Sequence, residues 1–345
     1  MQFETSASPH NNDVNNVARV MRHVIYALIP GTLAYAWFFG PGVLINLALA
    51  IALALGFEAL VLKLRKQAIK PVLSDGSALV TAWLLVLALP PLTPWWMIAI
   101  GIGFAIIVAK QLYGGLGYNP FNPAMVGYVV LIISFPREMT LWPAPQELAQ
   151  QSFGLWQSAQ IIFSGSLPNA LSWDAITMAT PLDITRTQLG QNMMLSEIQD
   201  SPLFGTFGGV GWEWIGNWFF LGGLYLLKVK IIDWRIPFSL IATLLIATTL
   251  TYASAPDAQA GPMFHLFSGG VILAAFFIAT DPVSAPASNR GRLIYGCGIA
   301  LFIVIIRQWG GYPDGIAFAV LLMNMVVPTI DHYIKPAVFG QSSKE

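Results

Sequence analysis

The chain has 345 residues, of which 56% are hydrophobic and only 10% are charged, against about 25% charged residues in an average soluble domain. Its 17 basic and 17 acidic side chains cancel, so the overall charge indicates no nucleic-acid partner. A large soluble protein is excluded, because its surface would need many more charged side chains.

The first half of the chain predicts five membrane-spanning helices. Residues 1–21 are polar and lack the apolar run of a signal peptide, so we expect a cytoplasmic amino-terminal segment. Apolar blocks follow it, each close to the length of about 20 residues that crosses a bilayer as a helix. They predict a membrane unit over residues 22–136, with spans at residues 22–40, 43–63, 76–93, 95–113 and 121–136.

A long polar stretch, residues 137–208, separates these spans from five more, which form a second unit over residues 209–331. Connections of this length are uncommon and usually functional. The second set of spans is predicted at residues 209–227, 236–254, 263–280, 292–308 and 313–331, and residues 332–345 form a tail. The predicted fold is therefore an all-α polytopic membrane protein of about ten helices. A tryptophan cluster is expected to anchor the sixth span at the membrane interface: Trp212, Trp214 and Trp218.

The basic residues orient the predicted spans. With the amino terminus in the cytoplasm, all but Arg137, Arg186 and Arg307 of the 17 Lys and Arg residues fall on one side. Lys and Arg accumulate in cytoplasmic loops, so both termini are predicted to be cytoplasmic. The stretch 137–208 is then predicted to face the periplasm.

The two sets of spans are predicted to be inverted repeats. The fourth span ends in Lys110-Gln111-Leu112-Tyr113-Gly114-Gly115, and the ninth ends in Arg307-Gln308-Trp309-Gly310-Gly311. Five spans per copy is an odd number, so the second copy must have the opposite orientation in the membrane. In folds of this kind the functional site lies between the copies, near interrupted helices.

The polar stretch contains the segment Asp174-Ala175-Ile176-Thr177-Met178-Ala179-Thr180-Pro181-Leu182-Asp183. Its two threonine hydroxyls allow two interpretations. A threonine hydroxyl can form an ester with a phosphate and so anchor a phosphate-bearing cofactor. Local chemistry alone favours the other interpretation, a helix cap or turn that uses Asp174 and Thr177.

Two asparagines and two prolines open the fifth span, in the segment Asn119-Pro120-Phe121-Asn122-Pro123. One interpretation is an interrupted helix start, which is stable at membrane depth only inside protein or beside a cavity. Asn119 and Asn122 would then donate hydrogen bonds to a bound cofactor. The other interpretation is a simple junction with proline in the first turn of the helix.

Ionisable side chains within the spans are candidates for an ion path, because burying them is costly unless they are paired. Glu58 in the second span is expected to extend to the membrane interface. Asp281 and Asp331 close the eighth and tenth spans, both on the predicted cytoplasmic side. Interface anchoring is the alternative role for these three carboxylates, and it is the favoured role for Lys110 and Arg307.

Four segments carry a resemblance to one family: Gly117-Tyr118-Asn119-Pro120-Phe121-Asn122-Pro123-Ala124-Met125, Asp174 to Asp183, Ala279-Thr280-Asp281-Pro282-Val283-Ser284-Ala285 and Ile330-Asp331-His332. Over nearly the whole chain, the sequence resembles the D subunits of Rnf ion-translocating electron-transport complexes. Those subunits are related to the B subunits of the sodium-translocating NADH:quinone reductases. The segment that ends at Thr180 is similar to the motif Asp-x-x-(Ser/Thr)-x-Ala-Thr, where flavin transferases attach FMN through its phosphate to the last threonine.

The resemblance implies that Thr180 carries covalent FMN, with Asp174, Thr177 and Ala179 at the matching positions of the transferase motif. Met178 departs from the family pattern, which has glycine at that position. The resemblance also implies a second, non-covalent flavin, riboflavin, within the membrane domain.

The function implied is that of a flavoprotein subunit in a complex of the bacterial inner membrane. The complex would couple electron transfer from NADH or ferredoxin to translocation of Na⁺ or H⁺. Other membrane and iron–sulfur subunits would deliver and remove electrons, and a flavin transferase would attach the FMN. The alternative is a channel or transporter for ions or small solutes, which fits a five-plus-five repeat equally well but leaves the segment around Thr180 unexplained.

Overall fold

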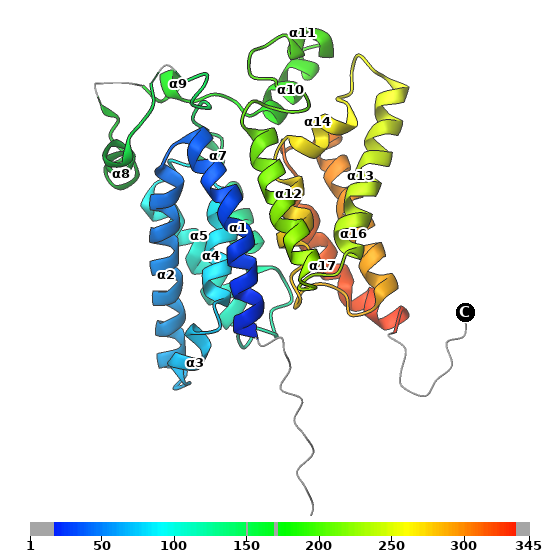
Figure 1. Ribbon diagram of the computed structural model, residues 1–345. Coiled ribbons are helices and arrows are strands. Elements are labelled where there is room, and N and C mark those ends of the chain that lie inside the picture. Colours follow the sequence, from blue (N-terminus) through cyan, green and yellow to red (C-terminus); the bar gives the residue numbers. More distant parts are fainter. Residues whose placement is uncertain (1–16, 150, 169–171, 336–345) are drawn as a thin grey trace, which may run out of the picture.

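The structure, a computed structural model, describes residues 17–149, 151–168 and 172–335. Within these ranges the regular elements are all helices, apart from two isolated β-bridges, which confirms the predicted all-α class. The predicted terminal segments lie largely outside the described residues, which exclude 1–16 and 336–345. Figure 1 shows the longer helices as two groups that lie side by side.

The first group contains the helices that precede the polar stretch. They are α1 (Val17–Phe39), α2 (Gly42–Leu64), α3 (Ile69–Leu73), α4 (Ser77–Ala88), α5 (Trp95–Gly103), the π-helix η1 (Phe104–Gln111) and α6 (Pro123–Ser134). Proline sets two of the boundaries. Pro90 and Pro91 prevent α4 from continuing, so this helix is shorter than the predicted span 76–93. Pro123 occupies the first turn of α6. A backbone N–H at this position has no acceptor within the helix, so proline costs the helix no hydrogen bond.

The second group contains the helices that follow the polar stretch. They are α12 (Trp212–Lys228), α13 (Arg235–Ser254), α14 (Pro262–Phe267), α15 (Val271–Leu273), the π-helix η3 (Ala274–Ile278), α16 (Asn289–Trp309) and α17 (Ile316–Tyr333). The eighth predicted span, 263–280, is interrupted between α14 and α15. Gly269 in this interruption has a φ of +78°, a conformation that glycine adopts readily.

Residues 137–208 fold into short helices rather than an open loop. These are α7 (Pro136–Met139), α8 (Leu155–Ser164), α9 (Trp173–Ile176), α10 (Pro181–Gly190) and α11 (Leu195–Gln199). Small apolar clusters attach them to the longer helices, as where Leu182 and Leu195 pack with Phe264 of α14. The polar stretch is therefore a folded layer over one end of the molecule.

Among the described residues, four helices are long and apolar enough to cross a membrane: α2, α13, α16 and α17. Shorter apolar helices accompany them, namely α4, α5 continued by η1, and α6. Interrupted helices are stable at membrane depth only where protein covers their free backbone groups. The π-helix η3 meets this condition, because all its residues are buried.

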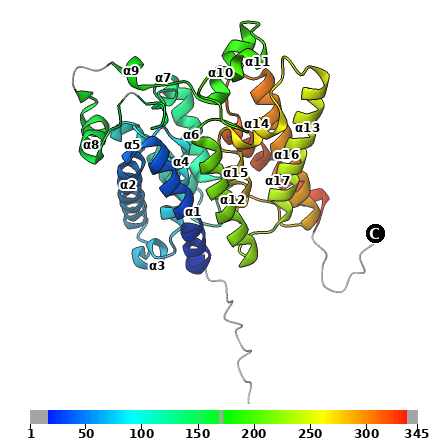
Figure 2. The same cartoon turned by 45° about the horizontal axis from the view of Figure 1, so that its top comes forward.

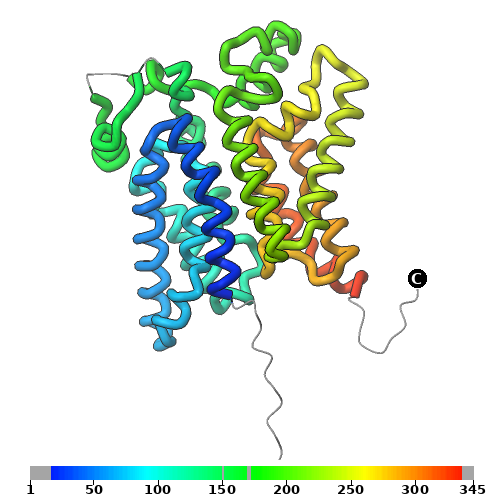
Figure 3. The backbone as a smooth tube through the Cα atoms, in the orientation of Figure 1, coloured from blue at the N-terminus to red at the C-terminus, as the bar shows by residue number. Residues whose placement is uncertain are grey.

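The two groups meet along two pairs of helices, α1 with α12 and α6 with α17. A Cβ atom on Gly222 of α12 would collide with the carbonyl oxygen of Ala27 in α1, so glycine permits the close approach of these helices. The start of α1 and the end of α17 lie at one end of the molecule, and the layer of α8 to α11 lies at the other (Figures 1 and 3).

Lys110 and Glu58 form an ion pair inside the first group. Lys110 Nζ lies 2.6 Å from Glu58 Oε1 and donates to Ser77 Oγ at 2.6 Å, while Gln111 Nε2 donates to the same carboxylate oxygen at 2.8 Å. The two charged side chains are 1% and 0% exposed. The predicted extension of Glu58 to the interface and the predicted anchoring role of Lys110 are therefore wrong, because each charge has its partner within the protein.

Arg307 is the matching buried cation of the second group. Its guanidinium donates to the carbonyl oxygens of His265 and Ser268, at 2.6 and 3.2 Å, and to Asp314 Oδ1 at 3.1 Å. The side chain is 1% exposed, so its predicted role as an interface anchor is also wrong. The His265 carbonyl lies in the last turn of α14 and the Ser268 carbonyl in the interruption before α15, so Arg307 donates to carbonyls that would accept from backbone N–H groups if the helix continued.

We expect Lys110→Met to destabilise the first group by about 3–5 kcal/mol, because it leaves the buried Glu58 carboxylate without its cation. The thermal unfolding midpoint of the purified protein in detergent measures the loss. The matched control is the double variant Glu58→Gln/Lys110→Met, which removes both charges and should regain most of the midpoint. A double variant that melts no higher than the single one would contradict the ion-pair explanation.

Candidate functional site

Thr180 caps the amino terminus of α10. Its backbone is extended, Pro181 occupies the first helical position, and Thr180 Oγ1 accepts a hydrogen bond from the Asp183 N–H at 3.3 Å. Threonine is favoured as a helix cap and proline as the residue after it. The structure thus gives a capping role to Thr180, which local chemistry did not single out as a cap, while Asp174 lies in the first turn of α9 and Thr177 is the residue at its carboxyl end.

The two threonine hydroxyls differ in their availability for chemistry. Thr177 Oγ1 donates to the carbonyl oxygen of Trp173 at 2.8 Å. Thr180 Oγ1 accepts a hydrogen bond, and its half-buried side chain borders a cavity. A hydroxyl that donates to a backbone carbonyl must give up that bond before it can form an ester. The geometry therefore favours Thr180 over Thr177 as the acceptor of a phosphoryl group.

Backbone pairing holds the segment that leads to Thr180. The Met178 N–H donates to the Trp142 carbonyl at 2.8 Å, and the Ala144 N–H donates to the Ile176 carbonyl at 3.1 Å. Met178 does not have a positive φ. This position therefore does not depend on glycine, and the departure from the family pattern at Met178 causes no backbone strain.

The other two positions of the motif lie beside Thr180 on the same segment. Asp174 is exposed in the first turn of α9, and Ala179 is half-buried. Neither residue borders the cavity next to Thr180. Their positions agree with a recognition role on the surface rather than with contact to a bound cofactor.

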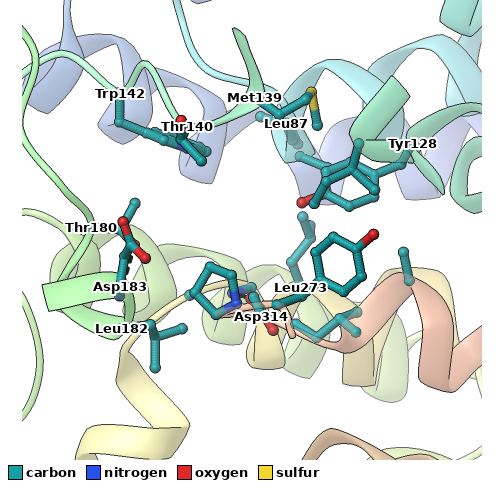
Figure 4. A pocket seen from close by; sticks show the side chains of 18 of the residues that line it. Leu87, Tyr128, Met139, Thr140, Trp142, Thr180, Leu182, Asp183, Leu273 and Asp314 are labelled. Atoms are coloured by element: carbon teal, nitrogen blue, oxygen red, sulfur yellow. Dashed lines mark hydrogen bonds between the residues drawn. The ribbon is translucent and has the colours of Figure 1, made fainter. Parts of the chain in front are cut away.

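The cavity beside Thr180 has a volume of about 340 Å³ and lies between the two helix groups. Helices of both groups contribute to its wall, together with α7 and α10 of the polar layer. Figure 4 shows Thr180 and Asp183 on one side of the cavity and Met139 and Tyr128 on the other. Mostly apolar cavities of about 300–1,000 Å³ with a few polar groups are typical sites for small molecules.

Aromatic rings from both halves of the chain line this cavity. The ring centroids of Trp142 and Trp212 are 4.9 Å apart at an interplanar angle of 56°, and Phe39 lies 5.0 Å from Trp212. Tyr312 borders the cavity and stacks on Phe318 with centroids 4.7 Å apart. Such rings present flat apolar faces to a planar aromatic ligand.

The tryptophan cluster at the start of α12 does not act as one interfacial belt. Trp214 and Trp218 are 56% and 44% exposed, as an anchor at the membrane interface requires. Trp212 instead borders the cavity and contacts Trp142. The predicted anchoring role is therefore wrong for Trp212, because its ring faces between the two helix groups.

Two carboxyl groups border the same cavity. Desolvation raises the pKa of Asp183 above its ordinary value, although the nearby Arg186 guanidinium acts to lower it. Asp314 accepts hydrogen bonds from the Arg307 guanidinium at 3.1 Å and from the Gly270 N–H at 3.3 Å. Sequence reasoning missed Asp314, although the repeated basic-Gln pair that contains Arg307 precedes it closely and could have drawn attention to it.

Asn119 and Asn122 line a second cavity, of about 450 Å³, which also lies between the helix groups. Its wall includes the start of α1 and the connection from α12 to α13, so this cavity lies at the end opposite α10 (Figure 1). Asn122 has partners in the protein, since its Nδ2 donates to the Ile278 carbonyl and its N–H donates to Asn324 Oδ1. Asn119 Oδ1 is buried and has no hydrogen-bond partner among the described residues.

The structure separates the three carboxylates of the predicted ion path. Asp281 lines the second cavity, as does Lys110, the partner of Glu58. Asp331 instead accepts the Ala287 N–H at 3.1 Å and borders neither cavity. Within the described residues, no group of three or more His, Cys, Asp or Glu side chains could hold a metal ion.

We expect Asp183→Asn to raise the thermal unfolding midpoint at about pH 7 by a few degrees at most. Because the folded-state pKa of Asp183 is raised, its ionisation costs stability progressively as pH rises from the unfolded toward the folded pKa. The advantage of the variant should therefore disappear as the pH falls below about 4, where Asp183 becomes protonated in both states. A difference that does not vary with pH would contradict this explanation.

Comparison with known proteins confirms the resemblance to this family. A model of the NQR2, RnfD, RnfE family matches residues 4–340. A protein of Aeromonas hydrophila, named as the D subunit of an ion-translocating oxidoreductase complex, is 50% identical, over 99% of this chain and 100% of its own length. Proteins of the same name from Vibrio cholerae and Escherichia coli are 50% and 48% identical, each over 99% of this chain and over 100% and 99% of their own lengths.

Proposed function

The chain belongs to the NQR2, RnfD, RnfE family and is a subunit of an ion-translocating oxidoreductase complex, in which we propose that it carries electrons on FMN esterified to Thr180. The family favours this role over that of a channel or transporter without redox chemistry. On its own the chain is a part of a translocase rather than a complete enzyme.

The observation that carries the proposal is that the Thr180 hydroxyl borders an aromatic cavity of about 340 Å³. A flavin tethered to this hydroxyl has a site next to its point of attachment. Trp142, Trp212 and Tyr312 would flank the ring system, whose planar faces suit such contacts. When bound, the flavin supplies reversible uptake of electrons, which no amino-acid side chain offers in this form.

The amino terminus of α10 suits the phosphate of the ester. Thr180 is the cap of this helix, and the Asp183 N–H already points to its Oγ1. Helix amino termini favour negative charge, because their backbone N–H groups lack partners within the helix. Asp174, Thr177 and Ala179 would serve the flavin transferase as recognition positions before the ester forms.

The test of this proposal is attachment of flavin to the chain. After co-expression with a flavin transferase, the purified chain should show in-gel flavin fluorescence after denaturation. Thr180→Ala should abolish the fluorescence, whereas the matched control Thr177→Ala should retain most of it. A wild-type band without fluorescence, in the presence of an active transferase, would contradict the proposal. Loss of fluorescence in Thr177→Ala alone would show that Thr177 is the attachment site.

The second cavity would hold the non-covalent flavin, riboflavin. The buried Asn119 Oδ1 needs a hydrogen-bond donor, and flavin rings carry one ring N–H group between two carbonyls. Lys110 also lines this cavity and uses two of its three N–H donors on Glu58 and Ser77. Asn122 is less available, because its amide already has partners in the protein.

We expect Asn119→Leu to lower the riboflavin released on denaturation by about tenfold or more, because the variant removes a hydrogen-bonding group from the site. Chromatography of the supernatant after acid precipitation measures the released flavin. Covalent flavin in the pellet provides the internal control and should not change. Equal amounts of released flavin in variant and wild type would rule out this site.

The proposed architecture is a pair of inverted five-helix repeats, over residues 22–136 and 209–331. Contacts at matching positions support it. Gln111 donates to Glu58 in α2, and Gln308 donates to Thr251 in α13 at 2.9 Å. Gly76 lies directly before α4 in the third span, Gly269 lies just before α15 in the eighth span, and each has a φ of +78°.

Both termini are proposed to be cytoplasmic and the layer that carries Thr180 periplasmic, in the bacterial inner membrane. The start of α1 and the end of α17 lie at the end opposite this layer in Figure 1, and this arrangement and the distribution of basic residues support the orientation. Other membrane and iron–sulfur subunits would bring electrons across to the flavin. The coupled ion would be Na⁺ or H⁺, and Asp281 is the carboxylate best placed for its path, since it borders the second cavity.

A further inference from the structure

The helix α8 lies apart from both cavities, at the periphery of the first helix group. It packs against α2, and Figures 1 and 2 both show it at the outer edge of the molecule, away from α10 and α11. Its buried side chains are Ser158, Ile161 and Ile162. These residues attach α8 to the protein, and the remaining faces of the helix make no comparable contact with it.

A second face of α8 is both apolar and exposed. Leu155, Trp156 and Phe163 are 62%, 82% and 54% exposed. At 3.6 residues per turn, these three side chains project from one side of the helix. Three large apolar side chains on one exposed stripe are more than the scattered exposure that soluble surfaces show.

A third face of α8 is polar but uncharged. The side chains at these positions are Gln157, Gln160 and Ser164. The helix thus presents one face to the protein, a neighbouring apolar face to the outside and a polar face beyond it. A helix that lies flat in the boundary of a bilayer beside a membrane-spanning helix requires this order of faces.

The absence of charge around α8 points to lipid rather than to the aqueous phase. From Leu148 to Trp173 the sequence contains no Lys, Arg, Asp, Glu or His. The adjoining helix α2 exposes Leu44 and Leu60 on its outer side, as a lipid-facing helix does. Of these two residues, Leu44 lies in the first turn of α2, at the end where the polar layer begins, so α2 and α8 both expose apolar side chains at this end of the molecule.

We propose that α8 is an interfacial helix, whose Leu155, Trp156 and Phe163 side chains insert into the headgroup–acyl boundary on the side of the membrane that carries the polar layer. The neighbouring backbone of the layer is thereby held at a fixed depth. This role does not depend on the flavin. The proposal thus puts α8 in contact with the membrane, although α8 belongs to the polar stretch that the sequence predicts to lie in the aqueous phase.

Spin labels test the proposal in the whole complex, reconstituted into nanodiscs of phosphatidylethanolamine and phosphatidylglycerol. With Cys297→Ser as background, single cysteines replace Phe163 on the apolar face and Ser164 on the polar face as the matched control. The label at position 163 should collide several-fold more with oxygen, which concentrates in lipid, than with a water-soluble nickel chelate. The label at position 164 should show the opposite preference.

The alternatives give different results. Preference for the nickel chelate at position 163 would mean that this face is in water, and low accessibility to both reagents would mean that a partner subunit covers it. Either result overturns the proposal. A label at Trp156→Cys provides a second measurement of the same face if the first variant does not assemble. The measurement is made equally well on the Thr180→Ala chain, so its outcome is independent of flavin attachment.

Discussion

The fold depends on the requirement that backbone and charged groups removed from water find partners within the protein. Regular helices satisfy their own backbone, but in this chain they begin, end or are interrupted near Gly76, Pro90 and Gly269. Buried Lys110 and Arg307 lie beside the first and third of these interruptions and donate to groups there. The interruptions in turn leave room between the two helix groups, where both cavities are found.

The arrangement brings residues together that are far apart in the chain. Trp142, Thr180, Trp212 and Asp314 come from four separate segments and border one cavity. The polar layer does not simply cover this cavity, because its backbone pairs with itself at Trp142 and Met178 and so places the motif against the helices. Function in this protein is therefore expected where the layer, the first group and the second group meet.

Much of the fold follows from local sequence. Apolar blocks predicted the long helices closely, as with α2 and α13, because length and hydropathy alone determine whether a helix can cross a membrane. The side-chain roles of Glu58, Lys110 and Trp212 were predicted wrongly, since hydropathy does not show which face of a helix meets another helix. Of the candidate site residues, the family resemblance singled out Thr180 and the asparagine–proline segment singled out Asn119, whereas Asp314 emerged only from the way α16 and α17 are brought beside α10.

The pairing that holds the motif has a consequence for the order of maturation. The segment before Thr180 is fastened by the two backbone hydrogen bonds at Met178 and Ala144, each worth about 1 kcal/mol. Detaching it is a local event that leaves the helix groups intact. If Thr180 is modified as proposed, the modifying enzyme would act on the segment while it is detached, and the modified threonine would then return to the cavity, so that modification and final placement would be two separate steps.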